Sequence, residues 1–220
     1  MIRVLLADDQ PLVRGGLIAL LDAEPDIEII GAAADGGEAL ELALELRPDV
    51  ACLDIRMPVM DGIEVAARIS PPQLDPPIPV LMLTTFDIDD YMFRALETGV
   101  SGFLLKDSDP EEILRAVRHV AGGYGTLDRS LTRRVVSEYV QRRRLQPVTP
   151  SRALSVITTR EREILMLLAQ GMTNSEIAEQ LTVEVATVKS HLARILPKLG
   201  VRSRLQAVVW AYQNHIVEIE

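Results

Sequence analysis

The sequence predicts an α/β domain with an open parallel sheet, followed by a smaller domain made only of helices. Two observations predict this. Five short apolar runs alternate with five helical patterns within residues 1–121, whereas residues 158–214 show helical patterns alone. Strands that alternate with helices form a parallel sheet whose two faces are covered. A change in the sign of the charge between the two parts supports the division.

The five apolar runs are rich in Val, Ile and Leu, as expected of strands buried on both faces. They comprise residues 2–7, 27–33, 50–54, 80–84 and 102–105. Apolar residues at helical spacing predict helices between and after them, around residues 12–21, 39–46, 63–69, 92–96 and 113–120. Open parallel sheets carry their sites at the C-terminal ends of the strands, so we expect the chemistry of this domain there.

The second part begins after a break in the pattern. Gly122 and Gly123 end the fifth helix, residues 128–144 form one more amphipathic stretch, and residues 146–151 have the composition of a linker. Four helices are then expected over residues 160–170, 174–181, 186–196 and 203–214. The expected organisation is a first domain over residues 1–121, a linker over 122–153 with a helix near 128–144, and a second domain over 154–217.

Charge is distributed unevenly along the chain. Residues 1–120 carry 23 acidic and 9 basic side chains, a net charge of −14, whereas residues 121–220 carry 9 acidic and 14 basic side chains, a net charge of +5. An acidic half joined to a basic half points to nucleic acid as a partner of the second half.

Several classes of protein are excluded by composition. The 220-residue chain has no apolar run of the ~18 residues that a membrane span needs. Its first residues, MIRVLLADDQ, do not form a secretory signal, so we expect a cytoplasmic protein. Cys52 is the single cysteine, which excludes an intrachain disulfide and a cysteine-rich metal site.

Acidic side chains follow two of the predicted strands. Asp8 and Asp9 end the first strand, and Asp54 ends the third. These strands can be neighbours in a doubly wound sheet, and the three carboxylates would then converge. Like charges that close require a proton or a cation. Carboxylate oxygens favour a hard divalent ion, so the pattern predicts a Mg²⁺ site.

Two further strand ends add groups suited to phosphoryl transfer. Thr84 ends the fourth strand and offers a hydroxyl, and Lys106 follows the fifth and offers an ammonium group. A metal ion, an ammonium group and a carboxylate nucleophile are the parts of phosphoryl transfer to an aspartate. A single Asp at a strand end is more often a helix cap or turn residue, but five such residues at four strand ends favour a site.

The polar residues at the strand ends match the motifs of a known family. Residues 1–121 resemble the receiver domain of two-component response regulators, through the pair Asp8-Asp9, Asp54 within DIRMPVMDG, Thr84 in LMLTT and Lys106 in SGFLLKD. The resemblance implies a flavodoxin-like fold with a five-stranded parallel sheet in the order 2-1-3-4-5. It also implies that a histidine kinase transfers a phosphoryl group to Asp54.

The resemblance assigns roles to individual residues. It implies that Asp9, Asp54 and the backbone carbonyl of Arg56 bind Mg²⁺, and that Asp8 acts through water. Phe103 occupies the position of the switch aromatic of the family, although it also fits an ordinary core aromatic. We expect phosphorylation to draw Thr84 toward the phosphoryl group and to turn Phe103 inward.

The second domain contains a candidate helix-turn-helix. In TNSEIAEQLTVEVATVKSHLARIL, two helices are joined by a tight connection around residues 182–185. A short helix, a turn and a second helix with polar N-terminal residues fit a motif that enters the DNA major groove, although the pattern also fits any small helical bundle. The candidate DNA-binding residues are Asn174, Thr187, Val188, Lys189, His191 and Arg194.

Residues 155–215 resemble the LuxR-type helix-turn-helix, and together the two parts resemble NarL/FixJ-type response regulators. This resemblance implies a four-helix DNA-binding domain whose third helix reads the groove and whose last helix dimerises. The candidate dimer contacts are Leu205, Val208, Val209 and Tyr212, which equally fit the core of the domain. The implied partners are a histidine kinase, double-stranded DNA and a second copy after phosphorylation, with RNA polymerase as a further candidate.

The favoured function is a DNA-binding regulator that phosphorylation of Asp54 switches toward dimerisation and operator binding. Two other functions are alternatives to it. A phosphatase of the haloacid-dehalogenase type needs a general acid two residues after its nucleophile, where this chain has Arg56, which cannot release a proton. A LuxR-type regulator gated by a small molecule needs an apolar cavity that a packed sheet does not offer. We therefore expect no enzymatic turnover beyond self-phosphorylation from a phosphodonor and slow self-dephosphorylation.

One residue conflicts with the helical pattern. Pro197 falls near the end of the third helix of the second domain, where its ring removes a backbone hydrogen bond and crowds the carbonyl of Ala193. Proline also biases the preceding residue away from helical angles. The local rule predicts that the helix ends or bends near Leu196 and that residues 198–200 form a loose last turn.

Overall fold

The computed structural model of the chain describes residues 1–70, 74–84, 94–95, 98–123, 126–127, 157–201, 203–214 and 216–217. The chain divides into two compact units, Met1–Thr126 and Leu127–Glu220. The helix expected over residues 128–144 and most of the helix expected around 92–96 lie outside the described residues. None of the described helices combines the length and the apolar character needed to span a bilayer.

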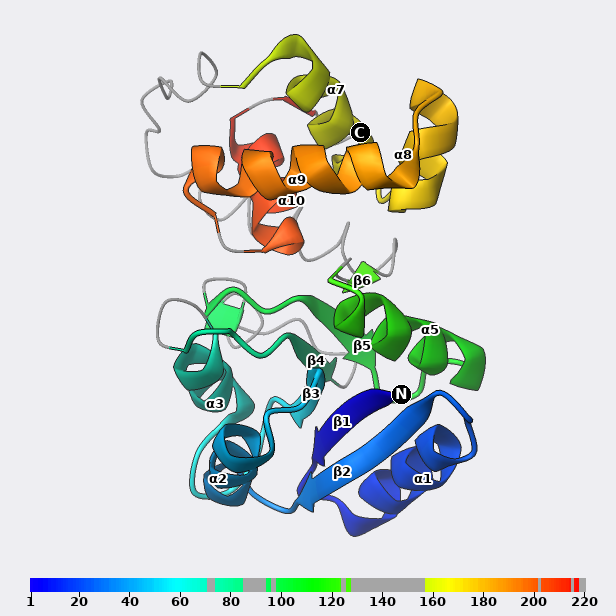
Figure 1. Cartoon of the computed structure of the whole chain (residues 1–220). Helices are drawn as coiled ribbons and strands as arrows, with labels where there is room; N and C mark the ends of the chain where they lie inside the picture. The colour runs from blue at the N-terminus through cyan, green and yellow to red at the C-terminus, as the bar shows by residue number, and fades with distance from the viewer. Residues whose placement is uncertain are drawn as a thin grey trace. The chain divides into compact units, whose positions relative to one another are not determined.

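The first unit is built on a parallel sheet (Figure 1). Its five main strands are β1 (Ile2–Ala7), β2 (Ile27–Ala33), β3 (Val50–Asp54), β4 (Val80–Thr84) and β5 (Gly102–Leu105). They lie in the order β2-β1-β3-β4-β5, which confirms the predicted topology. A two-residue strand that the sequence analysis did not predict, β6 (Thr126–Leu127), extends the sheet beyond β5.

Helices cover both faces of this sheet. The helices are α1 (Pro11–Asp22), α2 (Gly36–Leu46), α3 (Gly62–Ile69) and α5 (Pro110–Ala121). α1 and α5 contribute Leu17, Leu21, Val117 and Val120 to one core cluster with the strands. α2 and α3 lie side by side on the opposite face (Figure 1). The strands are consequently buried on both sides, as their uninterrupted apolar runs require.

Aspartate side chains begin three of these helices. Asp35, Asp61 and Asp109 each accept hydrogen bonds from backbone N–H groups in the first turn of α2, α3 and α5. An aspartate cap satisfies amide groups that have no partner within the helix. These three acids therefore have structural roles, which separates them from the acids at the ends of β1 and β3.

The second unit contains four helices: α7 (Thr159–Ala169), α8 (Asn174–Leu181), α9 (Val185–Leu199) and α10 (Arg204–Gln213). α7 and α8 both begin with a capping box, formed by Thr158 with Glu161 and by Thr173 with Glu176. In a capping box, each side chain accepts from the backbone N–H of the other residue. The four predicted helices are therefore all present, and their bounds differ from the expected ones by a few residues.

The predicted end of α9 near Leu196 is wrong. The helix continues through Pro197 to Leu199 and then closes with Gly200 in the left-handed region, at φ 68°. The N–H of Gly200 donates to the carbonyl of Pro197 at 3.1 Å, and the N–H of Val201 donates to that of Leu196 at 3.0 Å. This pair of hydrogen bonds is a Schellman motif, so the last turn is closed rather than loose.

Tertiary packing explains why the proline does not end the helix. Ile195 and Leu199 flank Pro197 and are buried in the core of the unit. The ammonium group of Lys198 lies 2.7 Å from the carboxylate of Glu161, whose side chain is 4% exposed. Ala193 and Pro197 are both exposed, so water can hydrogen bond to the carbonyl of Ala193 that lacks an N–H donor. Packing of the last turn therefore outweighs the local cost of the proline.

Replacing Pro197 with Ala is expected to raise the free energy of unfolding of the second unit by about 1–3 kcal/mol, because alanine restores the missing backbone hydrogen bond. Urea unfolding followed through Trp210, the single tryptophan, measures this change. Pro110→Ala is the control and is followed by circular dichroism, because Pro110 lies in the first unit. Pro110 occupies the first turn of α5, where proline removes no helical hydrogen bond, so the stability of this variant should change little. An equal or lower stability of Pro197→Ala would contradict the expectation.

Candidate phosphoacceptor site and nucleic-acid interface

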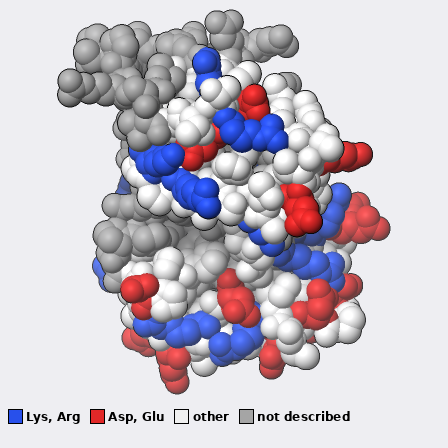
Figure 2. Space-filling model, turned by 45° about the horizontal axis from the view of Figure 1, so that its top comes forward, with Lys and Arg blue, Asp and Glu red and all other residues white. Residues whose placement is uncertain are grey.

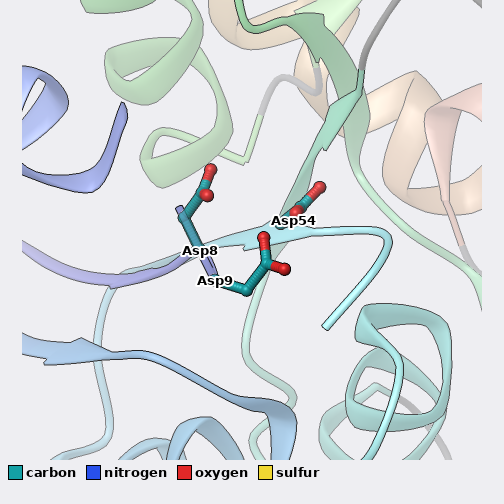
Figure 3. Close-up of side chains that lie close together, drawn as sticks. All are labelled: Asp8, Asp9 and Asp54. Carbon is teal, nitrogen blue, oxygen red and sulfur yellow. The ribbon is translucent and has the colours of Figure 1, made fainter. Parts of the chain in front are cut away.

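Three carboxylates meet at the C-terminal edge of the sheet. Asp8 and Asp9 follow β1, and Asp54 is the last residue of β3, its neighbour in the sheet. One carboxylate oxygen from each residue lies within 4.8 Å of the others (Figure 3). Asp8 is completely buried and Asp54 is 5% exposed, whereas Asp9 faces solvent. The cluster, called the acidic pocket below, therefore combines two buried carboxylates with one that faces solvent.

A single ammonium group compensates part of this charge. Nζ of Lys106, which follows β5, lies 2.8 Å from Oδ2 of Asp8 and 2.9 Å from Oδ2 of Asp54. The Lys106 side chain is only 8% exposed. The three carboxylates and this ammonium group leave a formal excess of two negative charges. The donor set consists of oxygen atoms alone, so the pocket fits a hard divalent cation such as Mg²⁺.

Burial and charge act in opposite directions on the titrating groups of the pocket. Burial raises the pKa of Asp54, and the neighbouring Lys106 only partly offsets this effect. Burial lowers the pKa of Lys106, but hydrogen bonds and charge interactions with Asp8 and Asp54 outweigh it, so the net pKa is raised. Lys106 is therefore protonated at neutral pH, and its charge favours the ionised form of Asp54.

The loop after Asp54 is shaped by a close backbone approach. A Cβ atom on Gly62, the first residue of α3, would lie 2.0 Å from the carbonyl oxygen of Asp54. The N–H of Gly62 donates to the carbonyl of Ile55 at 3.0 Å. The chain thus turns back onto the end of β3, and only glycine fits at this position. Arg56 lies within this loop with an exposed side chain, and its backbone N–H bonds to the Asp54 carboxylate.

Thr84 and Phe103 lie on the strands beside the pocket. Thr84, the last residue of β4, is 5% exposed, and its carbonyl accepts a hydrogen bond from the N–H of Lys106 at 2.9 Å. Phe103 lies on β5 and is also buried. The Phe103 ring is part of the buried core, and the expectation that phosphorylation turns it inward stays a prediction. Core packing against neighbouring strands is sufficient to hold it there.

One residue at this site is not evident from the sequence pattern. Arg14 of α1 donates a hydrogen bond from Nη1 to the backbone carbonyl of Asp8. Arg14 lies at the edge of the apolar pattern of α1, where an arginine is ordinarily a solvated residue. The contact of Arg14 with the acidic pair becomes evident only from the way α1 folds back over the end of β1.

The second unit presents a polar helix face. Exposed residues of α9 recur at helical spacing along one face, which comprises Ala186, Lys189, Ser190, Ala193, Arg194 and Pro197. Thr187 and His191 lie at intermediate exposure beside them. Lys198 is also exposed, but its ammonium group pairs with Glu161. Lys189 and Arg194 are the charged members of this face, and both are basic. Elsewhere the surface of the unit carries both signs of charge (Figure 2). Basic side chains between small residues on an exposed helix allow close approach to a phosphate backbone.

Known families match both units. Residues 4–118 match the family described as the response regulator receiver domain, and residues 155–211 match the bacterial regulatory proteins of the luxR family. The chain belongs to the two-component response regulators that carry a LuxR-type DNA-binding domain. The phosphatase and the small-molecule-gated regulator are therefore not favoured.

Relatives match this response regulator along its whole length. Transcriptional regulatory protein LiaR of Bacillus subtilis strain 168 is 45% identical over 217 residues, which cover 99% of this chain and all of LiaR. The nitrate/nitrite response regulator protein NarL of Escherichia coli K12 is 37% identical, and the match covers 97% of this chain and 96% of NarL. Both units therefore occur together in these relatives.

Solved structures support the same assignment. The response regulator ChrA of a heme-sensing two-component system is 35% identical, has a TM-score of 0.53 and covers 98% of both chains. A LuxR-family two-component response regulator from Aurantimonas sp. SI85-9A1 is 31% identical, with a TM-score of 0.57. That match covers 64% of this chain and 99% of the other.

The structure of the response regulator changes the interpretation of two candidate DNA-binding residues. Val188 lies on the inward face of α9, is completely buried and belongs to the core. Asn174 is 4% exposed, and its side-chain oxygen accepts a hydrogen bond from Arg204 at 2.6 Å. Neither side chain reaches the exposed face of α9. The helical pattern placed both on the motif, but only packing against the neighbouring helices decides which side chains face inward.

The guanidinium group of Arg204 joins the start of α10 to the start of α8. It donates to Asn174 and to the backbone carbonyl of Met172. Burial lowers the pKa of Arg204 to about 10, so the group remains charged at neutral pH. These hydrogen bonds compensate part of the cost of burying a charge. Asn174 thus holds the two helices together and does not form part of the exposed surface.

The candidate dimer contacts on α10 are also part of the core of this response regulator. Leu205, Val208, Val209 and Tyr212 are all buried within the second unit. The Tyr212 hydroxyl donates to the carbonyl of Ala169 at 3.2 Å, which ties α10 to the end of α7. The structure therefore corrects their assignment as dimer contacts. Gln206 and Trp210 of α10 and its C-cap residue Asn214 have intermediate exposure and recur every four positions on another face.

Proposed function

We propose that this response regulator accepts a phosphoryl group from a histidine kinase on the carboxylate of Asp54. The observation that supports this is the pocket in which Asp8, Asp9 and Asp54 meet with Lys106 as their one ammonium partner among the described residues. Asp9, Asp54 and the backbone carbonyl of Arg56 would hold Mg²⁺, with Asp8 acting through water. The proposed domains are residues 1–121 and 154–217, joined by a linker over 122–153.

The residues of the chain have distinct tasks in this reaction. Bound Mg²⁺ would neutralise charge on the transferring phosphoryl oxygens. A carboxylate oxygen of Asp54 attacks phosphorus, the bond from phosphorus to the donor nitrogen breaks, and the donor imidazole keeps the electron pair and takes a proton. Lys106 stabilises negative charge on the phosphoryl oxygens, and the Thr84 hydroxyl donates to one of them.

A small phosphodonor tests this assignment directly. Incubation of the full chain with acetyl phosphate and Mg²⁺ is expected to label Asp54 and no other residue, as read by peptide mass spectrometry after borohydride reduction of the acyl phosphate. Label on a different residue would overturn the assignment. In a separate incubation with p-nitrophenyl phosphate and Mg²⁺, the full chain should hydrolyse this substrate negligibly, because Arg56 cannot act as a general acid.

Phosphorylation then couples to the second unit. A phosphoryl group brings about −1.5 to −2 charges into the pocket, and the Thr84 hydroxyl moves toward it. The free energy available for the switch is the difference in interaction between the two states, so phosphorylation shifts an existing equilibrium toward a dimer. We assign dimer contact to the half-exposed face formed by Gln206 and Trp210 of α10 and its C-cap residue Asn214. RNA polymerase is a further candidate partner of the DNA-bound dimer.

The exposed face of α9 is proposed to enter the DNA major groove. Lys189 and Arg194 supply charge for phosphate contacts, and Thr187, Ser190 and His191 are the polar groups within reach of base edges. Dimers of helix-turn-helix proteins bind half-sites about one helical turn apart, so the operator is expected to have that spacing.

Replacing Lys189 with Ala is expected to weaken binding on all DNA sequences and to lower the slope of log K against log salt by about one, because one phosphate contact is lost. Fluorescence anisotropy at several salt concentrations measures both quantities. Arg162→Ala is a matched control, since Arg162 is an exposed arginine of α7 outside the α9 face, and its slope should match the wild type. An unchanged slope with lost discrimination at one base pair would assign Lys189 to base contact instead.

A further inference from the structure

Hydrogen bonds and an ion pair hold both the backbone and the side chain of Asp8 in this pocket. Its N–H donates to the carbonyl of Ala33 on β2 at 3.2 Å, and its Oδ1 accepts from the N–H of Gln10 at 2.9 Å. Its Oδ2 lies against Lys106. Its carbonyl accepts the hydrogen bond from Nη1 of Arg14. The side chain and both backbone groups of Asp8 are therefore held.

Asp9 is held differently. Within the described part of the chain, the Asp9 carboxylate takes part in no hydrogen bond or ion pair, and the residue is exposed. Its direction consequently depends on its backbone. The carbonyl of Asp8 and the N–H of Asp9 belong to one planar peptide group. A hydrogen bond that fixes this carbonyl therefore also fixes the orientation of the peptide plane that leads into Asp9.

α1 is placed to make this contact. The N–H of Arg14 donates to the carbonyl of Gln10 at 3.0 Å, which keeps the first turn of the helix regular directly after the acidic pair. The Arg14 side chain returns from that turn to the end of β1. The guanidinium group thus joins the first helix to the peptide group between the two acids.

We propose that Arg14 is a positioning residue of the acidic pocket, which orients the Asp8–Asp9 peptide so that the Asp9 carboxylate points toward those of Asp8 and Asp54. The inference rests on the proposed Mg²⁺-dependent phosphoacceptor function. Arg14 acts through the backbone and not as a ligand, because a guanidinium group has no acceptor atom for a cation.

The positive charge of Arg14 would have the opposite effect on a cation. A nearby positive charge disfavours Mg²⁺ binding. If Arg14 acted only through its charge, its removal would therefore strengthen Mg²⁺ binding. Loss of positioning weakens Mg²⁺ binding. Removing a group that orients metal ligands commonly lowers metal affinity by roughly 10–100-fold. The direction of the change therefore separates the two roles.

The experiment compares Mg²⁺ affinity by isothermal titration calorimetry for the full chain and three variants. Arg14→Ala is expected to bind Mg²⁺ roughly tenfold more weakly or worse. Arg14→Lys keeps the charge and one donor group and should recover part of the affinity. Arg3→Ala is the matched control, because Arg3 also donates to backbone carbonyls in this unit but at the other end of β1. Its affinity should equal that of the wild type or exceed it slightly.

A second readout keeps this inference separate from the proposed function. In the metal-free protein, the ¹H–¹⁵N resonance of Asp9 should shift in Arg14→Ala and remain in place in Arg3→Ala. Wild-type protein that binds no Mg²⁺ would contradict the proposed function, and the Asp9 resonance would then still decide the role of Arg14. Equal or tighter Mg²⁺ binding by Arg14→Ala, or an unmoved Asp9 resonance, overturns the inference.

Discussion

Replacing Asp54 with Asn is expected to abolish acceptance of a phosphoryl group from acetyl phosphate. Asparagine has nearly the same shape, but its amide oxygen carries no negative charge and cannot act as the nucleophile. The Asp54 side chain is 7% exposed and lies 2.9 Å from Lys106, whereas Asp8, the other carboxylate beside this ammonium group, is completely buried. Electrophoresis in a phosphate-binding gel measures the phosphorylated fraction.

Asp107→Asn provides the matched control for this experiment. Asp107 is exposed and follows Lys106 directly, so the variant makes the same chemical change beside the pocket without touching the nucleophile. It should accept the phosphoryl group at the wild-type rate. If Asp54→Asn accumulates acid-labile phosphate as fast as the wild type does, the assignment of the nucleophile is wrong.

Replacing Lys106 with Met is expected to destabilise the first unit and to eliminate the response of DNA binding to acetyl phosphate. The change leaves the buried carboxylates of Asp8 and Asp54 without their ammonium partner. Removal of one partner of a buried ion pair commonly costs about 3–5 kcal/mol. Urea unfolding followed by circular dichroism measures the loss, because the single tryptophan, Trp210, lies in the other unit.

The direction of two further changes makes this prediction specific. Mg²⁺ should stabilise Lys106→Met more than it stabilises the wild type, because the cation replaces the missing charge. Adding Asp54→Asn to Lys106→Met should recover part of the stability, since it removes one of the two uncompensated carboxylates. Unchanged unfolding of Lys106→Met without Mg²⁺ would show that the ion pairs contribute little to the stability of the pocket.

The sequence determined the residues of the acidic pocket because its features are local. Apolar runs define where each strand ends, and Asp8, Asp9, Asp54, Thr84 and Lys106 are polar residues at those ends. Parallel strands bring their C-terminal ends to one edge of the sheet. The positions of these residues in the chain were therefore sufficient to predict that they meet.

Other features depended on contacts that no local pattern contains. Helical spacing identifies an apolar face but not what covers it, so Leu205 and Tyr212 were open to a dimer or a core role until the packing of α10 against α7 was known. The contact of Arg14 with the Asp8 carbonyl depends on how α1 returns over β1.

Thus the sequence by itself determined the fold class, the two-domain order and the residue types of the acidic pocket. The tertiary structure decided which residues of the helical unit face inward, and it overrode the local rule at Pro197. There, burial of Ile195 and Leu199 and the ion pair between Lys198 and Glu161 stabilise the last turn of α9. The physical reason is that strand ends are set by neighbours in the chain, whereas the burial of a helical side chain is set by residues distant in the sequence.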